Sequence, residues 1–323
     1  MTDLAQAQQA YRDELLRAGL LISMGVDGLY GRSGTFEHVI ERINAAFSAV
    51  GDPDGPEVMR FPPGIGRWQL EKSGYLKSSP QLAGTIHSFF GGDREHRTMV
   101  ELIEKKGDWT AGQKTTEVAL APAACYGVYP AIAARGPLPA DGALVDVYTY
   151  VFRHEPSIDP ARMQMFRQRE HVRLGTADQA LAFRKLWMER GQALIGAIGL
   201  PFAVDVANDP FFGRTGKLLA SSQREESLKF ELLVPITSSE QPTACVSFNY
   251  HRDLFGAGWD IHTADGALAH TACVGFGVER IALGRAGQIL PGWRAQVVRR
   301  RRHRADPRFH RHGDQANGDW RVD

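Results

Sequence analysis

Residues 152–166 of this chain read FRHEPSIDPARMQMF, and the residues around them indicate a β-hairpin. The stretch 144–153 is rich in Val, Tyr and Thr, which favour strands. Residues 163–174 predict a second strand, and residues 155–162, which contain two prolines, predict the loop between the two. We therefore expect two neighbouring strands with charged residues close to their connection.

The polar residues of this hairpin suit a nucleotide. Because strand side chains alternate between faces, Arg153 and Glu155 are expected on one face. The fork of a guanidinium suits a phosphate, and a carboxylate suits an exocyclic amine. Phe166 on the returning strand offers a stacking plane for a purine. The alternative interpretation is a surface hairpin held by a weakly stabilising salt bridge.

A second polar element lies in an apolar stretch near the C-terminus, where residues 275–280 read GFGVER. Gly275 and Gly277 permit close packing against a sheet or a ligand. Arg280 places a full charge on an otherwise apolar helix, and a buried guanidinium needs an anion or a carboxylate partner. The element therefore indicates a second anion-binding position.

The remaining pattern predicts an α+β fold with a mainly antiparallel sheet flanked by helices. Ser33 or Thr35 is expected to cap the second helix, and Gly51-Asp52-Pro53 is expected to end it. The uncharged residues 118–134 are interpreted as core strand and turn. Further helices are expected at residues 4–18, 36–50 and 177–199, and further strands at 57–61, 228–235 and 245–250.

Composition indicates an intracellular globular protein. Hydrophobic residues make up 43% of the 323 residues, and charged residues make up 23%. The polar N-terminus lacks the apolar run of a secretory signal, and the pattern predicts no membrane span. Three well-separated cysteines suit a reducing cytoplasm. Residues 1–284 hold 28 basic against 33 acidic groups, which does not favour a nucleic-acid surface.

Together the hairpin and GFGVER resemble motifs 2 and 3 of class II aminoacyl-tRNA synthetases, FRxE…RxxxF and GxGxER. The resemblance implies an ATP site that works with Mg²⁺ and activates a carboxylic acid as its adenylate. Arg153 would hold the α-phosphate, Arg280 the γ-phosphate, Glu155 the adenine amine and Phe166 the adenine face. The helix at 36–50 and the strand at 57–61 resemble motif 1, which builds the homodimer interface of those enzymes.

Further residues resemble seryl-tRNA synthetases. The resemblance implies that Lys229 and the strand segment Ala244, Cys245, Val246 and Ser247 lie at the nucleotide, as do Arg162 and Met163 of the hairpin. The seryl enzymes of methanogens bind a catalytic Zn²⁺ through two Cys and one Glu, which here correspond to Cys125, Glu170 and Cys273. One such site leaves a position open for the α-amine of an amino acid, so Glu170 is also expected at the substrate. The alternative is that each cysteine is a small buried hydrophobe.

The acceptor is expected to be a protein and not tRNA, because the residues before the motif 1 helix leave no room for the tRNA-binding domain of seryl enzymes. The chain then resembles the amino acid:[carrier protein] ligases of rhizobia such as Bradyrhizobium. That resemblance implies glycine, or less often alanine, loaded onto the phosphopantetheine thiol of a carrier protein. The alternatives are a seryl-type tRNA synthetase paralogue and a non-catalytic regulator that senses amino acids.

Two further expectations concern charged segments. Arg214 and Lys217 are candidates for docking an acidic carrier protein, with an ordinary solvated turn as the alternative. Residues 285–323 hold ten Arg and four Asp but no Lys or Glu. We expect residues 1–284 to form the catalytic domain and residues 285–323 to be a disordered or frame-altered tail. Gly284 to Gly287 would then end the helix that carries Arg280 early.

Overall fold

The computed structural model describes residues 3–209, 212, 221, 223–224 and 226–290. Its centre is a seven-stranded sheet in the order β3-β7-β8-β12-β11-β10-β9. Only the β3–β7 pair within it is parallel, so the expected antiparallel α+β architecture is confirmed. The strands are β3 (Glu57–Met59), β7 (Ala143–Phe152), β8 (Met165–Gly175), β9 (Ala203–Val206), β10 (Lys229–Val234), β11 (Thr243–Arg252) and β12 (His270–Gly277).

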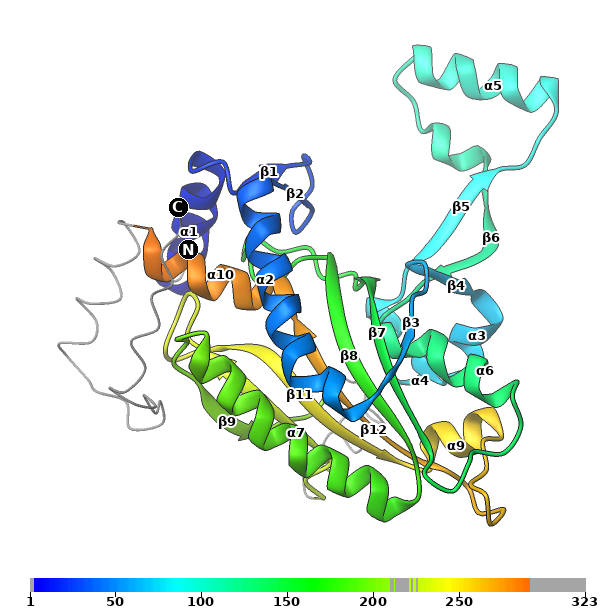
Figure 1. The fold of residues 1–323 in the computed structure, drawn as a ribbon. Coiled ribbons are helices and arrows are strands. Elements are labelled where there is room, and N and C mark those ends of the chain that lie inside the picture. Colours follow the sequence, from blue (N-terminus) through cyan, green and yellow to red (C-terminus); the bar gives the residue numbers. More distant parts are fainter. Residues whose placement is uncertain (1–2, 210–211, 213–220, 222, 225, 291–323) are drawn as a thin grey trace.

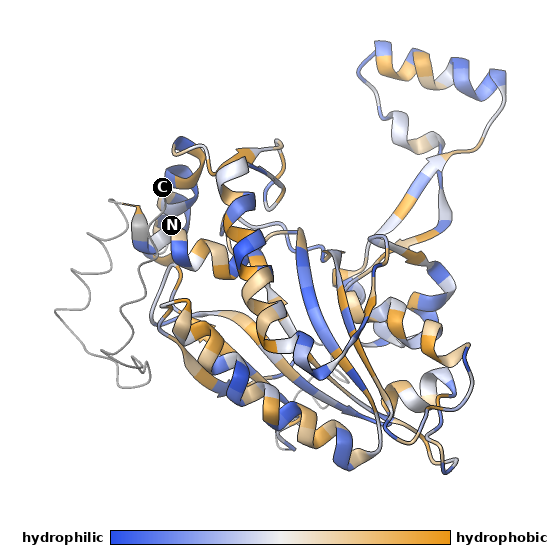
Figure 2. Cartoon of the chain, viewed as in Figure 1, coloured by the Kyte–Doolittle hydropathy of each residue, from blue (hydrophilic) through white to orange (hydrophobic). Residues whose placement is uncertain are grey.

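One face of the sheet carries helices α2 (Gly34–Gly51), α7 (Ala177–Ala197) and α10 (Val278–Ile289), as Figure 1 shows. The first two alternate between apolar and polar residues along their length (Figure 2), which is typical of helices with one face on a sheet. Phe47 of α2 stacks on Trp187 of α7 at 5.2 Å, which joins the two helices above the sheet. The expected cap of α2 is Ser33, whose hydroxyl accepts from the Phe36 N–H at 3.2 Å.

The N-terminal segment packs on the last helix. Helix α1 (Asp3–Arg17) is followed by the short hairpin of β1 (Leu21–Ser23) and β2 (Tyr30–Arg32). The buried Tyr11 hydroxyl donates to the carbonyl of Leu283 at 2.5 Å. Helix α10 continues through Gly284 and Gly287 to Ile289, so those glycines do not end it as expected. The remainder of the Arg-rich tail, 291–323, lies outside the described residues.

A second sheet, in the order β4-β6-β5, stands beside the first. It consists of β4 (Gly64–Gly66), β5 (Thr85–Phe89) and β6 (Gln113–Leu120), with α5 (Asp93–Glu104) and η3 (Trp109–Gly112) between the last two. Residues 118–134 were expected to be strand and turn, yet they also contain η4 (Ala124–Gly127) and α6 (Val128–Ala133). The remaining short elements are η1 (Asp52–Asp54), α3 (Arg67–Lys72), α4 (Tyr75–Ser78), η2 (Pro80–Leu82) and α9 (Leu254–Trp259).

Candidate active site

A pocket of about 330 Å³ lies on the sheet face opposite helices α2 and α7. Strand alternation decides which side chains reach it. On β8, Gln168 and Glu170 line the pocket, whereas Arg167 and Arg169 turn toward the helical layer and pair with Glu37 and Asp146. The opposite wall comes from residues of α4, η4 and α9.

The three candidate metal ligands meet in this pocket. Strand β12 pairs with β8 so that Gly275 lies opposite Glu170, which sets Cys273 close to that carboxylate. Cys125 in η4 lies close enough to both Cys273 and Glu170 for the two to shift its pKa. The Ala124 N–H donates to Glu170 Oε1 at 3.2 Å. The structure therefore brings together the side chains of Cys125, Glu170 and Cys273, which are far apart in the sequence.

Burial and mutual contact shift the proton affinities of this trio. Burial and the neighbouring Cys273 raise the pKa of Glu170 to about 8. Contact with Cys273, burial and Glu170 raise the pKa of the Cys125 thiol. Contact with Cys125, together with His251 and Asn249, lowers the pKa of Cys273 despite its burial. One thiol of the pair is thereby favoured as the thiolate.

The donor set suits zinc, because two thiols and a carboxylate are ligands that Zn²⁺ prefers. Glu170 Oε2 is also buried without a hydrogen-bond partner among the described residues, which a bound cation would satisfy. However, the side chains of the trio are not positioned as a metal site in this structure. In the described part of the chain, no group of three or more His, Cys, Asp or Glu residues is placed to hold a metal ion. The zinc assignment therefore stays a prediction.

Two polar residues beside the trio were not predicted. The Asn249 amide donates to Cys273 Sγ at 3.3 Å, and His251 Nε2 lies 3.8 Å from the same sulfur. Both belong to β11, where they follow Ser247 at intervals of two and therefore share its face. That spacing in SFNYH was the signal that could have identified them.

Phe166 lies close to two guanidinium groups. The Cζ atoms of Arg153 and Arg280 stand 5.7 and 5.8 Å from its ring centroid. Arg153 Nε donates to the carbonyl of Pro122 at 3.0 Å, and Arg280 donates to the carbonyls of Ala161 and Ala244 at 2.9 and 2.8 Å. These three residues from motifs 2 and 3 therefore form one cluster, while their roles at the nucleotide stay predictions. Within the described residues Arg280 forms no ion pair with a carboxylate, which leaves its charge available to an anion.

The loop of the hairpin differs from the expectation. Strand β7 ends at Phe152, so Arg153 and Glu155 do not share a strand face. Glu155 instead accepts a hydrogen bond from Arg162 Nη1 at 3.2 Å. Met163 is buried, and its sulfur contacts Arg32 Nη2 at 3.4 Å. The position of the Glu155 carboxylate is thus set by the loop and by the ion pair with Arg162.

The neighbouring strands add a charged cluster. Lys229 Nζ lies 2.6 Å from Asp209 and 3.1 Å from Glu231. Burial raises the pKa of Asp209, but Lys229 outweighs burial and the pKa falls to about 2. On β11, Ser247 lines the pocket, whereas Cys245 and Val246 are buried and Ala244 offers its carbonyl to Arg280. Arg214 and Lys217, the candidate docking residues, lie outside the described residues.

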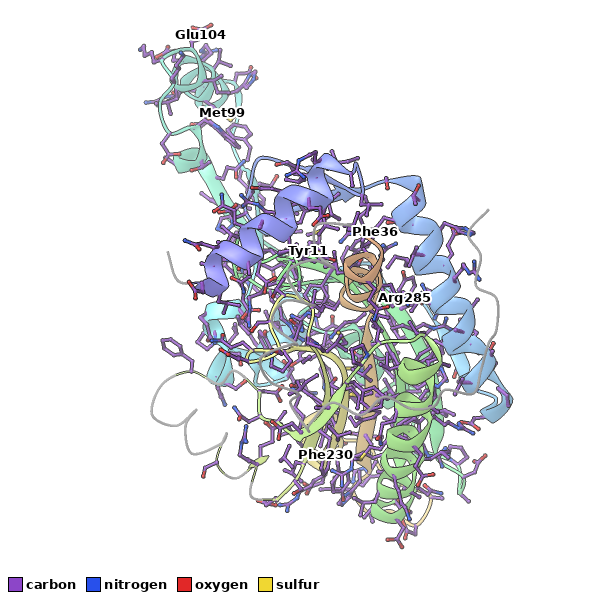
Figure 3. The ribbon with its side chains drawn as sticks, turned by 90° about the vertical axis from the view of Figure 1, so that its left-hand side faces the viewer. Tyr11, Phe36, Met99, Glu104, Phe230 and Arg285 are labelled. Carbon is purple, nitrogen blue, oxygen red and sulfur yellow. The ribbon has the colours of Figure 1, made fainter. Side chains whose placement is uncertain are left out.

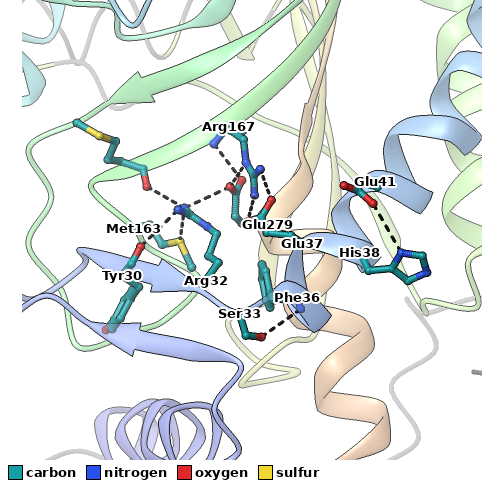
Figure 4. Close-up of polar contacts among 11 residues, drawn as sticks. Tyr30, Arg32, Ser33, Phe36, Glu37, His38, Glu41, Met163, Arg167 and Glu279 are labelled. Carbon is teal, nitrogen blue, oxygen red and sulfur yellow. Dashed lines mark hydrogen bonds and ion pairs between the residues drawn. The ribbon is translucent and has the colours of Figure 1, made fainter.

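Behind the cluster, Glu279 anchors the start of α10 (Figure 4). It pairs with Arg167 at 2.7 Å and with Arg32 at 3.2 Å. The guanidinium of Arg167 donates in turn to both carboxylate oxygens of Glu37. The sequence had not predicted this network, whose members come from four separate segments.

Comparison with known proteins was consistent with this geometry. No protein-family model matches the chain. It is 48% identical over 281 residues to amino acid–[acyl-carrier-protein] ligase 1 of Bradyrhizobium diazoefficiens, covering 86% of each chain. It is 50% identical over 268 residues to ligase 2 of the same organism, covering 83% of this chain and 80% of that one. A type-2 serine–tRNA ligase of Methanopyrus kandleri is 28% identical over 209 residues, which are 61% of this chain and 38% of the relative.

Solved structures share the fold. The M. kandleri seryl-tRNA synthetase, in complex with A. aeolicus tRNASec, superimposes with a TM-score of 0.72 at 20% identity, over 85% of this chain and 56% of that one. The seryl-tRNA synthetase of Pyrococcus horikoshii gives a TM-score of 0.61 at 13% identity, over 85% of this chain and 57% of that one. The core is therefore that of a class II aminoacyl-tRNA synthetase. On the strength of its two close relatives, the chain belongs to the family of amino acid–[acyl-carrier-protein] ligases.

Proposed function

We propose that this ligase activates a small amino acid, with glycine as the first choice, and transfers it to the phosphopantetheine thiol of a carrier protein. One structural observation supports this proposal in addition to the family membership. A single pocket is lined by Arg153 and Lys229, which suit a nucleotide, and by the Cys125, Glu170 and Cys273 trio, which suits an amino acid. The two substrates of an adenylate-forming step would therefore meet there.

In the first step, a carboxylate oxygen of the amino acid attacks the α-phosphorus of ATP, and pyrophosphate leaves. Arg153 would stabilise the charge that builds on the α-phosphate, and Arg280 would hold the γ-phosphate. Phe166 would stack on the adenine, with Glu155, Arg162 and Met163 at its edge. Further nucleotide contacts are assigned to Lys229 and to residues Ala244, Cys245, Val246 and Ser247. Mg²⁺ accompanies the ATP phosphates.

In the second step, the carrier thiol attacks the carbonyl carbon of the adenylate, AMP leaves as the C–O bond to its phosphate breaks, and the thiol proton passes to solvent. No side-chain nucleophile is needed for either step. Cys125, Glu170 and Cys273 would hold one zinc ion, which when bound would take the α-amine of the substrate and select an amino acid. Asn249 and His251 would hold the Cys273 sulfur in position for that role.

The finer assignments rest on sequence. We assign residues 1–284 to the catalytic domain and the rest to a tail, and we assign Arg214 and Lys217 to carrier docking. A homodimer formed through the α2–β3 segment would follow the motif 1 resemblance. All three cysteines are unpaired thiols, which suits the cytoplasmic setting that we propose. No helix in the described part of the chain has the length and apolarity to cross a membrane.

ATP–pyrophosphate exchange across all amino acids tests the reaction directly. We expect exchange with glycine, weaker exchange with alanine, and loss of both after Cys273→Ala or chelation. Lys185→Ala is the control, because Lys185 is exposed on α7, on the sheet face opposite the pocket, and should be tolerated. Charging of tRNA in place of carrier protein would contradict the proposed acceptor, and absence of exchange with every amino acid would contradict the activation step.

A further inference from the structure

One wall of the pocket carries a buried tyrosine hydroxyl. Tyr75, the first residue of α4, lines the pocket together with Ser73, Ser78 and Arg153. Its hydroxyl oxygen is buried, yet it has no hydrogen-bond partner within the described residues. Because a buried polar group without a partner is costly, such a group in a substrate pocket indicates a hydrogen bond that forms only when the substrate is bound.

The backbone and a neighbouring ring hold Tyr75 in place. Gly74, whose φ of 77° lies in the left-handed region, turns the chain from α3 into α4. The Tyr75 N–H donates to Ser73 Oγ at 3.3 Å, and the Tyr75 carbonyl accepts from the Ser79 N–H at 2.8 Å. The ring packs edge-to-face on Tyr126, with the two centroids 5.8 Å apart. The direction of the hydroxyl is therefore determined by packing before any substrate binds.

The base of the second sheet supports this wall. Tyr75 and Tyr126 both pack on a small buried cluster, which consists of Ile65, Leu70, Ala119 and Ala121. The rest of that sheet, residues 85–118, projects from the body, and Figure 3 shows Met99 and Glu104 at its far end. The wall is thus fixed by elements that lie outside the three motifs, so the motif resemblance gave no signal for Tyr75.

The proposed function, on which this inference rests, indicates which substrate atom lies near the hydroxyl. In an aminoacyl adenylate, the carbonyl carbon lies between the α-amine and the α-phosphate, which we assign to the Cys125 trio and to Arg153. Tyr75 is placed beside both positions, because its ring packs on the residue that follows Cys125 and because it lines the pocket with Arg153. Burial raises the pKa of the Tyr75 hydroxyl to about 12, although the Arg153 cation opposes this, so the hydroxyl keeps its proton and can donate.

We infer that Tyr75 is a catalytic residue of the transfer step, in which its hydroxyl donates a hydrogen bond to the carbonyl oxygen of the adenylate. When the carrier sulfur attacks the carbonyl carbon, one electron pair of the C=O bond moves onto this oxygen, and the hydrogen bond stabilises the charge. The C=O bond then forms again, the C–O bond to the phosphate breaks, and AMP leaves with that electron pair. Tyr75 keeps its own proton throughout, and the thiol proton passes to solvent.

The two steps differ in what happens to charge on the acyl oxygens. During activation, the carboxylate loses negative charge as it attacks ATP. During transfer, negative charge builds on the carbonyl oxygen. A donor at this oxygen therefore accelerates transfer and adds little to activation.

Single-turnover transfer from preformed glycyl adenylate to free pantetheine, measured against hydrolysis without the thiol, tests the inference. We expect Tyr75→Phe to slow transfer at least about 100-fold, which is the usual effect of removing one oxyanion donor. ATP–pyrophosphate exchange by the same variant should change less than about threefold. Its melting temperature should be unchanged or higher, because the substitution removes a buried hydroxyl that has no partner. Tyr30→Phe is the control, because Tyr30 is a buried tyrosine on β2 outside the pocket and should keep both rates.

Each other outcome has a distinct meaning. Transfer at the wild-type rate by the Tyr75 variant would overturn the inference. Equal losses of exchange and transfer would also overturn it, since they would place the hydroxyl at the phosphate, and a clear fall in melting temperature would assign it a structural role. Because the adenylate is supplied preformed, a wild type that transfers without pyrophosphate exchange contradicts only the proposed activation. A wild type that does not transfer at all contradicts both proposals.

Discussion

Glu279 accepts two hydrogen bonds from Arg167, one from its main-chain N–H at 2.9 Å and one from Nε at 2.7 Å. Arg167 belongs to the returning strand of the motif 2 hairpin, and Glu279 directly precedes Arg280 at the start of α10. The pair therefore fixes the two motifs relative to each other from behind the pocket. Glu37 of α2 holds the same guanidinium, so the motif 1 helix belongs to this arrangement too.

We expect Glu279→Gln to lower the free energy of unfolding by about 3 kcal/mol, because it leaves Arg32 and Arg167 buried with less negative charge between them. Urea denaturation at neutral pH measures this loss. Glu57→Gln is the matched control, because Glu57 also forms a two-pronged pair, with Arg135, but on the surface. The control should lose less than about 1 kcal/mol. Equal losses of unfolding free energy in the two variants would show that burial of the Glu279 network adds nothing to its contribution to stability.

Phe166→Leu should raise the KM for ATP roughly tenfold in pyrophosphate exchange, because an aliphatic side chain cannot stack on a base or interact with a guanidinium as an aromatic ring does. Leucine has nearly the same side-chain volume as phenylalanine, so the melting temperature of the variant should change little. Phe230→Leu is the control: Phe230 also lies under a guanidinium, with Arg184 Cζ 5.3 Å from its ring centroid, but it does not line the small cleft that Phe166 shares with Arg280. If both variants raise KM equally, Phe166 does not contact the nucleotide.

Sequence patterns predicted the parts of the fold that local chemistry determines. The two hairpin strands, 144–153 and 163–174, were placed within two residues, because alternation and β-branched residues mark them. The nearness of Cys125 to Cys273 has no local signal, since it arises from the pairing of β12 with β8 and from the position of η4. Only the family resemblance had indicated it.

Tertiary contacts account for what was predicted wrongly. Gly284 was expected to end a helix, but a Cβ there would lie 3.1 Å from Leu200, so glycine lets α10 pack closely without breaking. Glu155 left the expected strand face because β7 ends at Phe152 and because Pro156 follows. The projecting segment 85–118 was not anticipated, because none of its residues is buried in the structure and its apolar residues therefore mark no core element.

His171 makes stability sensitive to mild acid. Its ring is buried against Phe47 and Trp187, with neither nitrogen hydrogen-bonded within the described residues. Burial lowers its pKa from 6.5 to about 4, despite the nearby carboxylate of Asp146. Below pH 6.5 the unfolded chain takes up a proton that the folded chain refuses, so the free energy of unfolding falls as the pH drops toward 4, by up to about 3 kcal/mol.

The change His171→Gln should flatten this part of the pH profile, measured by urea denaturation between pH 7 and pH 4. His38→Gln, at an exposed position on α2, is the control and should keep the wild-type slope. An unchanged slope in the His171 variant would assign the acid sensitivity to other groups.

The tight fit around His171 gives a last prediction, at the end of α2. A Cβ on Gly51 would lie 2.3 Å from His171 Cε1, a distance that real side chains do not tolerate. The ring cannot move aside, because Phe47 and Trp187 pack against it at 4.7 and 5.0 Å. Gly51→Ala should therefore cost about 1–3 kcal/mol of unfolding free energy through overpacking. Gly34→Ala, at the other end of the same helix, has no atom within 4 Å and should be neutral or slightly stabilising, because alanine favours helix. Thermal denaturation of both variants measures the difference, and a neutral Gly51→Ala would mean that α2 can shift away from β8.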